Sequence, residues 1–352
     1  MDRTARAGVL SCAECVAGVR ARTASALVVT GAIDVRYLVL DASTSPTEWG
    51  VRVPCSTSNL GPGFDLLGLA LDRFVTIRAR LPAERTDGMR TSYSGHTPPD
   101  TAGPDSVART FAAFDRAFGC KLPALDVEVA SEIPIGRGFG SSGAVVAAAL
   151  LVAAEVSGRA DLARDRERAL VPLACELEGH PDNSTASLLG GCTLGCPLED
   201  GRLAVVRQPV HRSIGFALAW PDEPLSTAES RQALPADVSF DDARENPRRL
   251  ALLLEGLRTG APGLLAAGVA DRLHERFRRP LVEGADEACA RAVEAGAYAA
   301  CLSGAGSGLV ALGPVGSMEG VAAALAAPLD GGRSAVVRPV LDPPDVRAYA
   351  RT

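Results

Sequence analysis

The stretch Ile-Pro-Ile-Gly-Arg-Gly-Phe-Gly-Ser-Ser-Gly at residues 133–143 decides the fold, because it joins two segments of different periodicity. Residues 125–133 alternate between apolar and polar side chains, whereas residues 144–156 are dominated by alanine, valine and leucine. This order predicts a strand, a glycine-rich loop and a buried helix. The glycines let the backbone approach a ligand, and Ser141 or Ser142 is expected to cap the helix. Free N–H groups at such a helix start typically bind an anion, most often phosphate.

Three interpretations of this loop compete. A Walker A loop needs a lysine directly before the helix. The only lysine of the chain, Lys121, lies upstream of the strand, so a Walker A loop is excluded. A dinucleotide-binding fingerprint fits Gly138-x-Gly140-x-x-Gly143 in isolation, but the first strand and helix of the chain are not joined by such a loop. A turn without any ligand is the third interpretation, and so many glycines without a use would be costly in conformational entropy.

Composition narrows the class of protein. The chain has 352 residues, of which 47% are hydrophobic and 22% charged, which suits two globular domains. A net charge of −6 argues against a general nucleic-acid binder, and no apolar run is long enough to cross a membrane. Nine cysteines without a regular framework indicate reduced thiols in the cytoplasm. The pair Cys12-x-x-Cys15 has no matching second pair, so a zinc site is not expected.

The mixture of helical and strand patterns in both halves predicts an α+β protein with two domains. Residues 1–49 are interpreted as an N-terminal extension of unknown role, with possible strands at 26–30 and 35–40. Residues 50–209 are expected to form the first domain and residues 210–352 the second.

Several local patterns are specific enough to test. Residues 54–65 are expected to form a loop, and a helical stretch at 161–179 is expected to break at Pro172. Ser226-x-x-Glu229 is a capping box that opens a short helix, and another helix is expected to begin at Pro247.

Four stretches carry a family resemblance. They are Asn-Leu-Gly-x-Gly-Phe-Asp at 59–65, the glycine loop at 134–144, Glu-Gly-His-Pro-Asp-Asn at 178–183, and Leu-Ser-Gly-Ala-Gly-Ser-Gly at 302–308. In this order they resemble the motifs of the GHMP small-molecule kinases, most closely those of homoserine kinases. Two further segments, at 226–231 and 271–278, are similar to homoserine kinase segments, and the resemblance spans about residues 50–340. The family loop usually carries leucine where Phe139 stands.

The resemblance implies both a fold and an activity. The implied fold joins an N-terminal domain like ribosomal protein S5 domain 2 to a C-terminal ferredoxin-like domain, with ATP and acceptor between them. The implied activity is the transfer of the γ-phosphoryl group of ATP to the side-chain hydroxyl of L-homoserine, a step toward threonine. A homodimer is also expected from the family.

The resemblance assigns ATP to the glycine loop and Mg²⁺ to its helix. The expected ATP-binding residues are Pro134, Gly136, Arg137, Gly138, Phe139, Gly140, Ser141, Ser142 and Gly143. Mg²⁺ prefers oxygen ligands, so the hydroxyl of Ser142 and one carboxylate are expected to hold it. Glu176 is the first choice, because it lies four residues before His180 and the two would share a helix face. Glu178 is the alternative.

Homoserine brings an ammonium group, a carboxylate and a hydroxyl. Asp65 and Asn59 can accept hydrogen bonds from the ammonium group. Arg231 and Arg278 match the family's substrate arginines, and a guanidinium group binds a carboxylate through two parallel hydrogen bonds.

Residues 178–183 are expected to surround the reacting hydroxyl. The resemblance puts Asp182 beside it, either as a general base or as a group that only orients it. His180 and Asn183 are expected to shape the pocket. A supporting glycine turn is expected at Ser303, Gly304 and Gly306.

Two other functions compete with phosphorylation of homoserine. A sister GHMP kinase would act on another hydroxy amino acid or small alcohol, but mevalonate-type kinases carry a lysine that residues 53–59 lack. A non-catalytic relative would keep the fold and bind ligand without turnover. The presence of Ser142, Glu176 and Asp182 argues against that relative.

Overall fold

The computed structural model describes residues 47–83, 88–96 and 105–349. These residues form two β-sheets with associated helices, which confirms the α+β class predicted from the sequence. Strand β1 begins at Glu48, and the possible strands at 26–30 and 35–40 lie outside the described residues.

The larger sheet has seven strands and is built around a long hairpin of β1 and β2. Its main path runs β11-β1-β2-β4-β3, and β5 pairs with β2 and with β6. Strands β3 and β4 are parallel, and the other described pairs in this sheet are antiparallel. The strands are β1 (Glu48–Asn59), β2 (Gly63–Arg80), β3 (Arg90–Gly95), β4 (Asp126–Ser131), β5 (Cys192–Pro197), β6 (Leu203–Gln208) and β11 (Val346–Tyr349).

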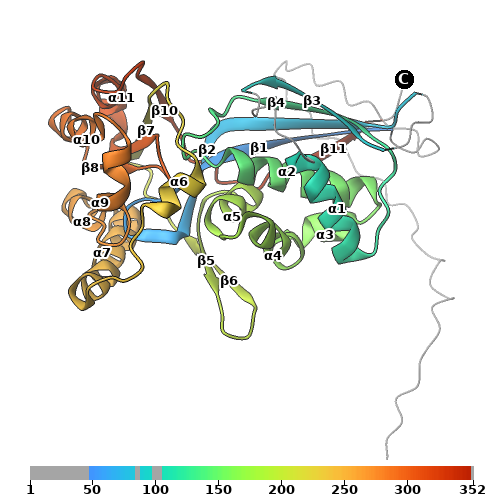
Figure 1. The fold of residues 1–352 in the computed structure, drawn as a ribbon, viewed down its shortest axis with the longest axis horizontal. Helices are drawn as coiled ribbons and strands as arrows, with labels where there is room; N and C mark the ends of the chain where they lie inside the picture. The colour runs from blue at the N-terminus through green and yellow to red at the C-terminus, as the bar shows by residue number, and fades with distance from the viewer. Residues whose placement is uncertain (1–46, 84–87, 97–104, 350–352) are drawn as a thin grey trace, which may run out of the picture. The chain divides into compact units, whose positions relative to one another are not determined.

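Helices cover one face of this sheet (Figure 1). Helix α2 packs on β1 and β2 and is bordered by α1, α4 and α5. It is buried along most of its length because it is apolar on all sides rather than along one stripe. The helices are α1 (Ser106–Phe118), α2 (Ser141–Val156), α3 (Ala160–Arg164), α4 (Arg166–Glu178) and α5 (Asp182–Leu189).

The smaller sheet has four antiparallel strands in the order β10-β7-β9-β8. Helices α10 and α11 pack on one face, and Phe216, Leu218 and Leu312 join the core that is shared with the larger sheet. The strands are β7 (Ile214–Trp220), β8 (Ala299–Leu302), β9 (Leu309–Pro314) and β10 (Arg333–Val337). The helices are α6 (Thr227–Gln232), α7 (Phe240–Thr259), α8 (Pro262–Gly268), α9 (Glu275–Arg278), η1 (Arg279–Leu281), α10 (Ala285–Glu294), η2 (Val315–Ser317) and α11 (Met318–Ala326).

The expected loop at 54–65 is mostly strand, so that prediction was wrong. β1 continues to Asn59 and β2 begins at Gly63, which leaves a short turn between them. The polar residues at 56–58 hid this strand from a hydrophobicity pattern, although all of them are buried and pair with β2.

Both proline-based helix boundaries were also wrong. Pro172 lies inside α4, and the break falls instead at Asp165, between α3 and α4. Pro247 lies inside α7, which is capped at its start by Ser239. Tertiary packing therefore outweighs the one backbone hydrogen bond that each proline removes. The capping box of Ser226 and Glu229 at α6 is confirmed.

The domain boundary at 209/210 stays a prediction, although β11, from the C-terminal segment, pairs with β1 of the larger sheet. Within the described ranges, none of the helices combines the length and apolar character that a membrane span requires. The seven cysteines of these ranges have free thiols.

We expect Leu150→Ala to destabilise the protein by about 2–5 kcal/mol, because Leu150 of α2 is fully buried and its loss leaves a cavity. Urea denaturation measures this change. Phe240→Ala is the control, because that side chain is 83% exposed and should change stability by less than about 0.5 kcal/mol. Equal effects of the two substitutions would contradict a packed core around α2.

Candidate active site

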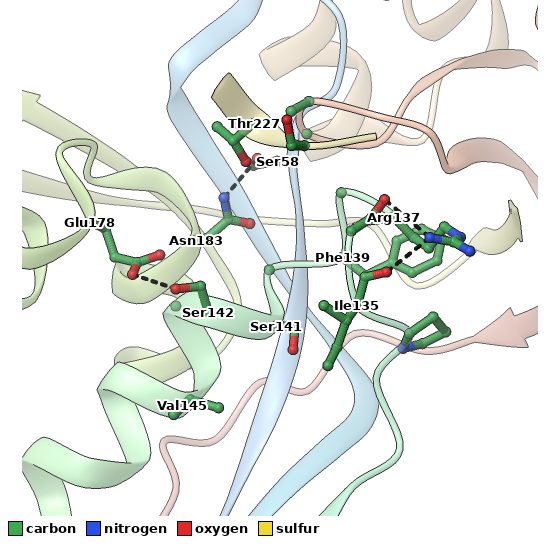
Figure 2. A pocket seen from close by; sticks show the side chains of 18 of the residues that line it. Ser58, Ile135, Arg137, Phe139, Ser141, Ser142, Val145, Glu178, Asn183 and Thr227 are labelled. Atoms are coloured by element: carbon green, nitrogen blue, oxygen red, sulfur yellow. Dashed lines mark hydrogen bonds between the residues drawn. The ribbon is translucent and has the colours of Figure 1, made fainter. Parts of the chain in front are cut away.

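A cavity of about 1030 Å³ brings together the four sequence motifs. The glycine loop, the start of α2 and the start of α6 line it (Figure 2). Asp182 with its neighbours and the turn at 304–306 line it too. Residues in or next to β3, α1 and β4 line it as well, and the sequence motifs did not indicate these. They are Thr91, Tyr93, His96, Asp105, Ser106, Arg109, Val129 and Ser131.

The glycine loop is held by its carbonyl groups. The carbonyl of Gly136 accepts a hydrogen bond from the N–H of Leu225 at 2.9 Å, and that of Arg137 accepts one from Gly308 at 3.1 Å. The carbonyl of Gly138 accepts a hydrogen bond from the Ser303 hydroxyl at 2.8 Å. Within the described part of the chain, the backbone N–H groups of residues 136–143 have no hydrogen-bond acceptor. The loop therefore presents a row of free donors, as an anion site requires.

Helix α2 begins differently from the sequence expectation. Its N-cap is Gly140, and neither Ser141 nor Ser142 caps it, since both lie in its first turn. Gly140 has a φ of +64°, which favours glycine, and a Cβ there would collide with the Ser56 side chain. The serine hydroxyls are consequently free for other partners.

Two side chains of the loop point away from the free donors. The Arg137 guanidinium group donates hydrogen bonds to the carbonyls of Pro221, at 2.9 Å, and of Asp222. It also donates one to the carbonyl of Ile135 in its own loop at 3.0 Å (Figure 2). Phe139 is 2% exposed and packs edge-on against Trp220 with ring centroids 5.5 Å apart. These residues can contribute to an anion site through their backbone, while their side chains fasten the loop.

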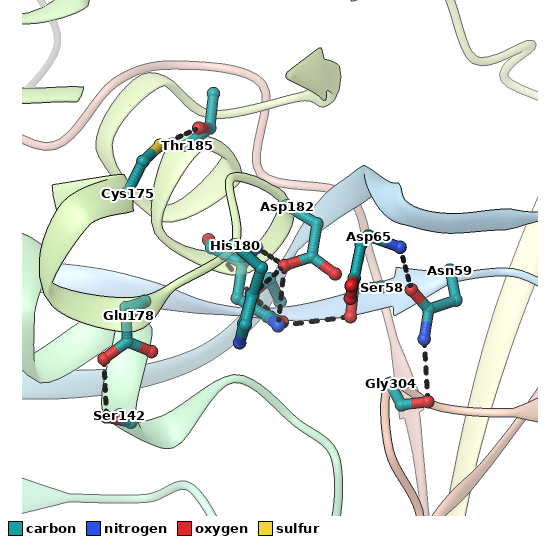
Figure 3. A network of polar contacts seen from close by, with 12 residues as sticks. Ser58, Asn59, Asp65, Ser142, Cys175, Glu178, His180, Asp182, Thr185 and Gly304 are labelled. Atoms are coloured by element: carbon teal, nitrogen blue, oxygen red, sulfur yellow. Dashed lines mark hydrogen bonds and ion pairs between the residues drawn. The ribbon is translucent and has the colours of Figure 1, made fainter. Parts of the chain in front are cut away.

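The carboxylate beside Ser142 is Glu178. The Ser142 hydroxyl donates a hydrogen bond to Oε1 of Glu178 at 2.8 Å (Figures 2 and 3). Burial raises the pKa of Glu178, and the hydrogen bond from Ser142 lowers it in part. Glu176, the first choice from the sequence, is exposed and does not line the cavity. The reason is that α4 ends at Glu178, so His180 lies beyond the helix and shares no helix face with Glu176.

Asp182 is 2% exposed and is the centre of a polar network (Figure 3). Its Oδ1 atom lies 2.5 Å from Nδ1 of His180 and accepts the backbone N–H of Asn183 at 2.7 Å. Burial raises the pKa of Asp182, but the hydrogen bond and charge of His180 outweigh it and hold the pKa below its usual value. Burial lowers the pKa of His180, and the contacts with Asp182 reverse that shift, so that the pKa lies above its usual value.

Polar residues of β1 connect this network to the other motifs. Asn183 donates a hydrogen bond to the Ser58 hydroxyl at 3.1 Å and accepts one from the Ser56 hydroxyl at 3.0 Å. Thr57 forms a hydrogen bond of 2.8 Å with the Ser303 hydroxyl. Sequence analysis did not select these residues, although a run of polar side chains in a buried strand was a signal that could have found them.

Asn59 and Asp65 stand on either side of the turn between β1 and β2. Their φ angles are +69° and +51°, in the left-handed region that asparagine and aspartate enter more readily than most residues. Oδ1 of Asn59 accepts the backbone N–H of Asp65 at 3.0 Å, and its Nδ2 donates to the carbonyl of Gly304 at 2.8 Å. The Asn59 side chain thus fixes Asp65 and the glycine turn relative to each other.

The two expected substrate arginines lie on the same side of the cavity as Asp65. Arg231 forms two parallel hydrogen bonds with the Asp65 carboxylate, each 3.0 Å long. Arg278 is 2% exposed, and its Nε donates a hydrogen bond to the carbonyl of Ser230 at 3.2 Å. The guanidinium carbon of Arg278 lies 4.9 Å from the centre of the Phe64 ring. One carboxylate and two cations therefore meet at this end of the cavity.

Two family profiles match the chain. One describes the N-terminal domain of GHMP kinases and matches residues 105–191, and the other describes their C-terminal domain and matches residues 253–331.

Among curated proteins, a homoserine kinase of Synechococcus sp. is 39% identical over 280 residues, which cover 78% of this chain and 87% of that protein. A homoserine kinase of Parasynechococcus marenigrum is 40% identical over 267 residues, which cover 74% of this chain and 82% of that protein.

Solved structures agree with the sequence comparisons. The crystal structure of a homoserine kinase from Cytophaga hutchinsonii superposes with a TM-score of 0.76 at 25% identity, covering 88% of this chain and 100% of that one. A putative homoserine kinase from Listeria monocytogenes gives a TM-score of 0.65 at 27% identity, covering 86% of this chain and 100% of that one. A mevalonate kinase from L. major, at 15% identity and a TM-score of 0.60 over 85% of this chain and 97% of that one, is similar in fold.

We expect the pKa of His180 to lie above its usual value in the wild-type protein and to fall in Asp182→Asn, because the carboxylate that opposes the effect of burial most strongly is then lost. Proton NMR titration measures it, and with four histidines in the chain a His180→Gln variant identifies the resonance. The pair stabilises the fold fully between the unfolded-state pKa values of Asp182 and His180. This stabilisation is lost as the pH rises through the raised pKa of His180, and also as it falls through the lowered pKa of Asp182. An unchanged pKa in Asp182→Asn would contradict the coupling.

Proposed function

The chain belongs to the homoserine kinase family of the GHMP kinases, and we propose that it transfers the γ-phosphoryl group of ATP to the side-chain hydroxyl of L-homoserine. The product would be O-phospho-L-homoserine. The homodimer and the cytoplasmic location expected from the sequence stay predictions.

The observation that carries the substrate class is the charge pattern beside Asp182. Asp65, Arg231 and Arg278 line the same cavity as Asp182. A carboxylate and two guanidinium groups complement the ammonium and carboxylate groups of a free amino acid. Neither a sugar nor a simple alcohol would use both charges. In our proposal Asp65 binds the ammonium group, while Arg231 and Arg278 bind the carboxylate.

The nucleotide would occupy the end of the cavity that the glycine loop forms. The free N–H groups of residues 136–143 support binding of its phosphates there. Ser142 and Glu178 supply a hydroxyl and a carboxylate 2.8 Å apart at the start of α2, and such oxygen donors suit Mg²⁺. Bound Mg²⁺ would neutralise phosphate charge during transfer. In the described ranges no group of three or more His, Cys, Asp or Glu side chains forms a metal site.

The transfer itself needs positioning more than covalent chemistry. The acceptor oxygen forms a bond to the γ-phosphorus while the bond from that phosphorus to the β,γ-bridging oxygen breaks and ADP leaves. The acceptor hydroxyl loses its proton in the same step. Backbone donors of the glycine loop hold the phosphates, and the charged groups around Asp65 hold the acceptor.

Asp182 is proposed to meet the acceptor hydroxyl through Oδ2, because the hydrogen bonds of His180 and Asn183 converge on Oδ1. Its lowered pKa makes Asp182 a weak base. A carboxylate of this kind orients the hydroxyl first and accepts its proton only late in the transfer. This favours orientation as its main contribution.

The proposed function predicts a clear order of acceptors. With MgATP, ADP release should be fastest with L-homoserine in a panel that also contains L-threonine, L-serine, mevalonate and galactose, because L-homoserine matches both charges and the reach to the γ-phosphate. A coupled ADP assay measures the rates, and phosphorus NMR identifies the phosphorylated product. The Asp182→Asn variant controls for contaminating kinases. A higher kcat/KM with another alcohol would reassign the substrate, and ATP binding without turnover of any acceptor would favour a non-catalytic relative.

Arg231→Ala should raise the KM for homoserine roughly 30- to 150-fold, equivalent to about 2–3 kcal/mol for a lost charge-assisted hydrogen-bond pair. The KM for ATP should stay within about twofold, since Arg231 pairs with Asp65 rather than with the glycine loop. Steady-state kinetics with each substrate varied in turn measures both values. Arg276→Ala is the matched control, because Arg276 pairs with Asp242 and does not line the cavity. An unchanged homoserine KM in Arg231→Ala would move the carboxylate site elsewhere.

A further inference from the structure

The charges that line the cavity are balanced before a nucleotide enters. Four carboxylates, those of Asp65, Asp105, Glu178 and Asp182, face the arginines Arg109, Arg137, Arg231 and Arg278. A triphosphate adds several negative charges, which require nearby cations. The single lysine of the chain does not line the cavity, so these arginines are the lysine and arginine side chains that could compensate phosphate charge there beside Mg²⁺.

Three of the four arginines are already engaged. Arg137 is bound by backbone carbonyls, and Arg231 is bound on both sides of its fork by Asp65. Arg278 is buried at the acceptor end beside the Phe64 ring. None of them is free to turn toward the donors of the glycine loop without giving up those contacts.

Arg109 differs from the other three. Its side chain is exposed, its described hydrogen bond is to the Ser106 hydroxyl at 3.2 Å, and it forms no ion pair with any residue that the structure describes. Arg109 and Glu178 line the same cavity, and the charge of Arg109 slightly opposes the rise that burial causes in the pKa of Glu178. Arg109 is therefore a cation near the pair of Ser142 and Glu178 whose charge is not neutralised by a described partner.

The helix dipole does not favour an arginine at this position. Arg109 follows the N-cap Asp105 by four residues, at the start of α1, where the helix dipole disfavours a positive charge. Helix α1 packs against α2, so both helices turn their N-terminal residues toward the same cavity. The described residues therefore leave the Arg109 guanidinium group available to an anionic ligand in the cavity.

We propose that Arg109, which lines the same cavity as the glycine loop, binds the phosphate groups of ATP in the role that a lysine has in Walker A loops. This inference rests on the proposed function only in that the ligand is ATP, and it does not depend on which acceptor is phosphorylated. Arg109 is then a further substrate-binding residue, supplied by a helix outside the four sequence motifs.

Equilibrium binding of ATP, ADP and adenosine to the full-length chain tests this role, at fixed Mg²⁺ and without an acceptor. Arg109→Ala should weaken ATP and ADP binding by about 10- to 100-fold, the range for a lost charge-assisted hydrogen bond, and leave adenosine binding within about twofold. Arg109→Lys should recover part of the loss, because it keeps the charge. Arg116→Ala is the matched control, since Arg116 lies two turns further along the same helix and outside the cavity.

The outcomes separate this inference from the proposed function. Unchanged ATP affinity in Arg109→Ala would overturn the phosphate role, and so would an equal loss for adenosine, which would indicate contact with the base or ribose. A loss that Arg109→Lys does not recover, together with a lowered thermal midpoint, would also overturn it in favour of a structural role. Homoserine turnover by the wild-type chain is measured separately, so a failure to phosphorylate homoserine leaves the binding comparison intact.

Discussion

The anchoring of the glycine loop by its own carbonyl groups is the interaction on which the site depends. The acceptors at Gly136, Arg137 and Gly138 are bound from the connection after β7 and from the turn between β8 and β9, all outside the larger sheet. A single hydrogen bond of this kind adds only about 0.5–1.5 kcal/mol to stability. Its larger effect is on orientation, because a peptide whose carbonyl is fixed on one side presents its N–H on the other. The row of free donors in the cavity follows from this constraint.

The polar segment of β1 relates the two ends of the cavity to each other. Buried hydroxyl groups are unfavourable unless they are hydrogen-bonded, and Ser56, Thr57 and Ser58 find their partners in Asn183 and Ser303. Asn183, which follows Asp182, is thereby fixed to β1. The turn at Ser303, which holds the glycine loop, is fixed to the same strand. Phosphoryl transfer requires the acceptor and the phosphate to be aligned, and one rigid strand supports that alignment.

Sequence patterns predicted the elements with strong periodicity and the motifs with unusual glycine content. The strand, loop and helix around residues 133–143 and the capping box at Ser226 are examples. Sequence patterns did not predict helix ends and side-chain positions that depend on tertiary packing. The choice of Glu176 assumed that α4 continues to His180, whereas Gly179 ends it. The cap position at Gly140 excludes a larger residue because a Cβ there would collide with Ser56. Arg109 was not selected because its position near Glu178 arises only when α1 packs on α2.

The ion pair of Asp65 and Arg231 gives the acceptor end its selectivity in the proposed function. Without a ligand the two charges neutralise each other through two hydrogen bonds of 3.0 Å, and both side chains are partly exposed, so the pair contributes little to stability. A ligand with a single charge would separate Asp65 from Arg231 and leave one of these two side chains without a partner. A zwitterionic amino acid replaces both halves at once, because its ammonium group matches Asp65 and its carboxylate matches Arg231. The free energy needed to separate Asp65 from Arg231 is then offset only by a substrate that carries both an ammonium group and a carboxylate. The ion pair therefore makes the site selective for amino acids.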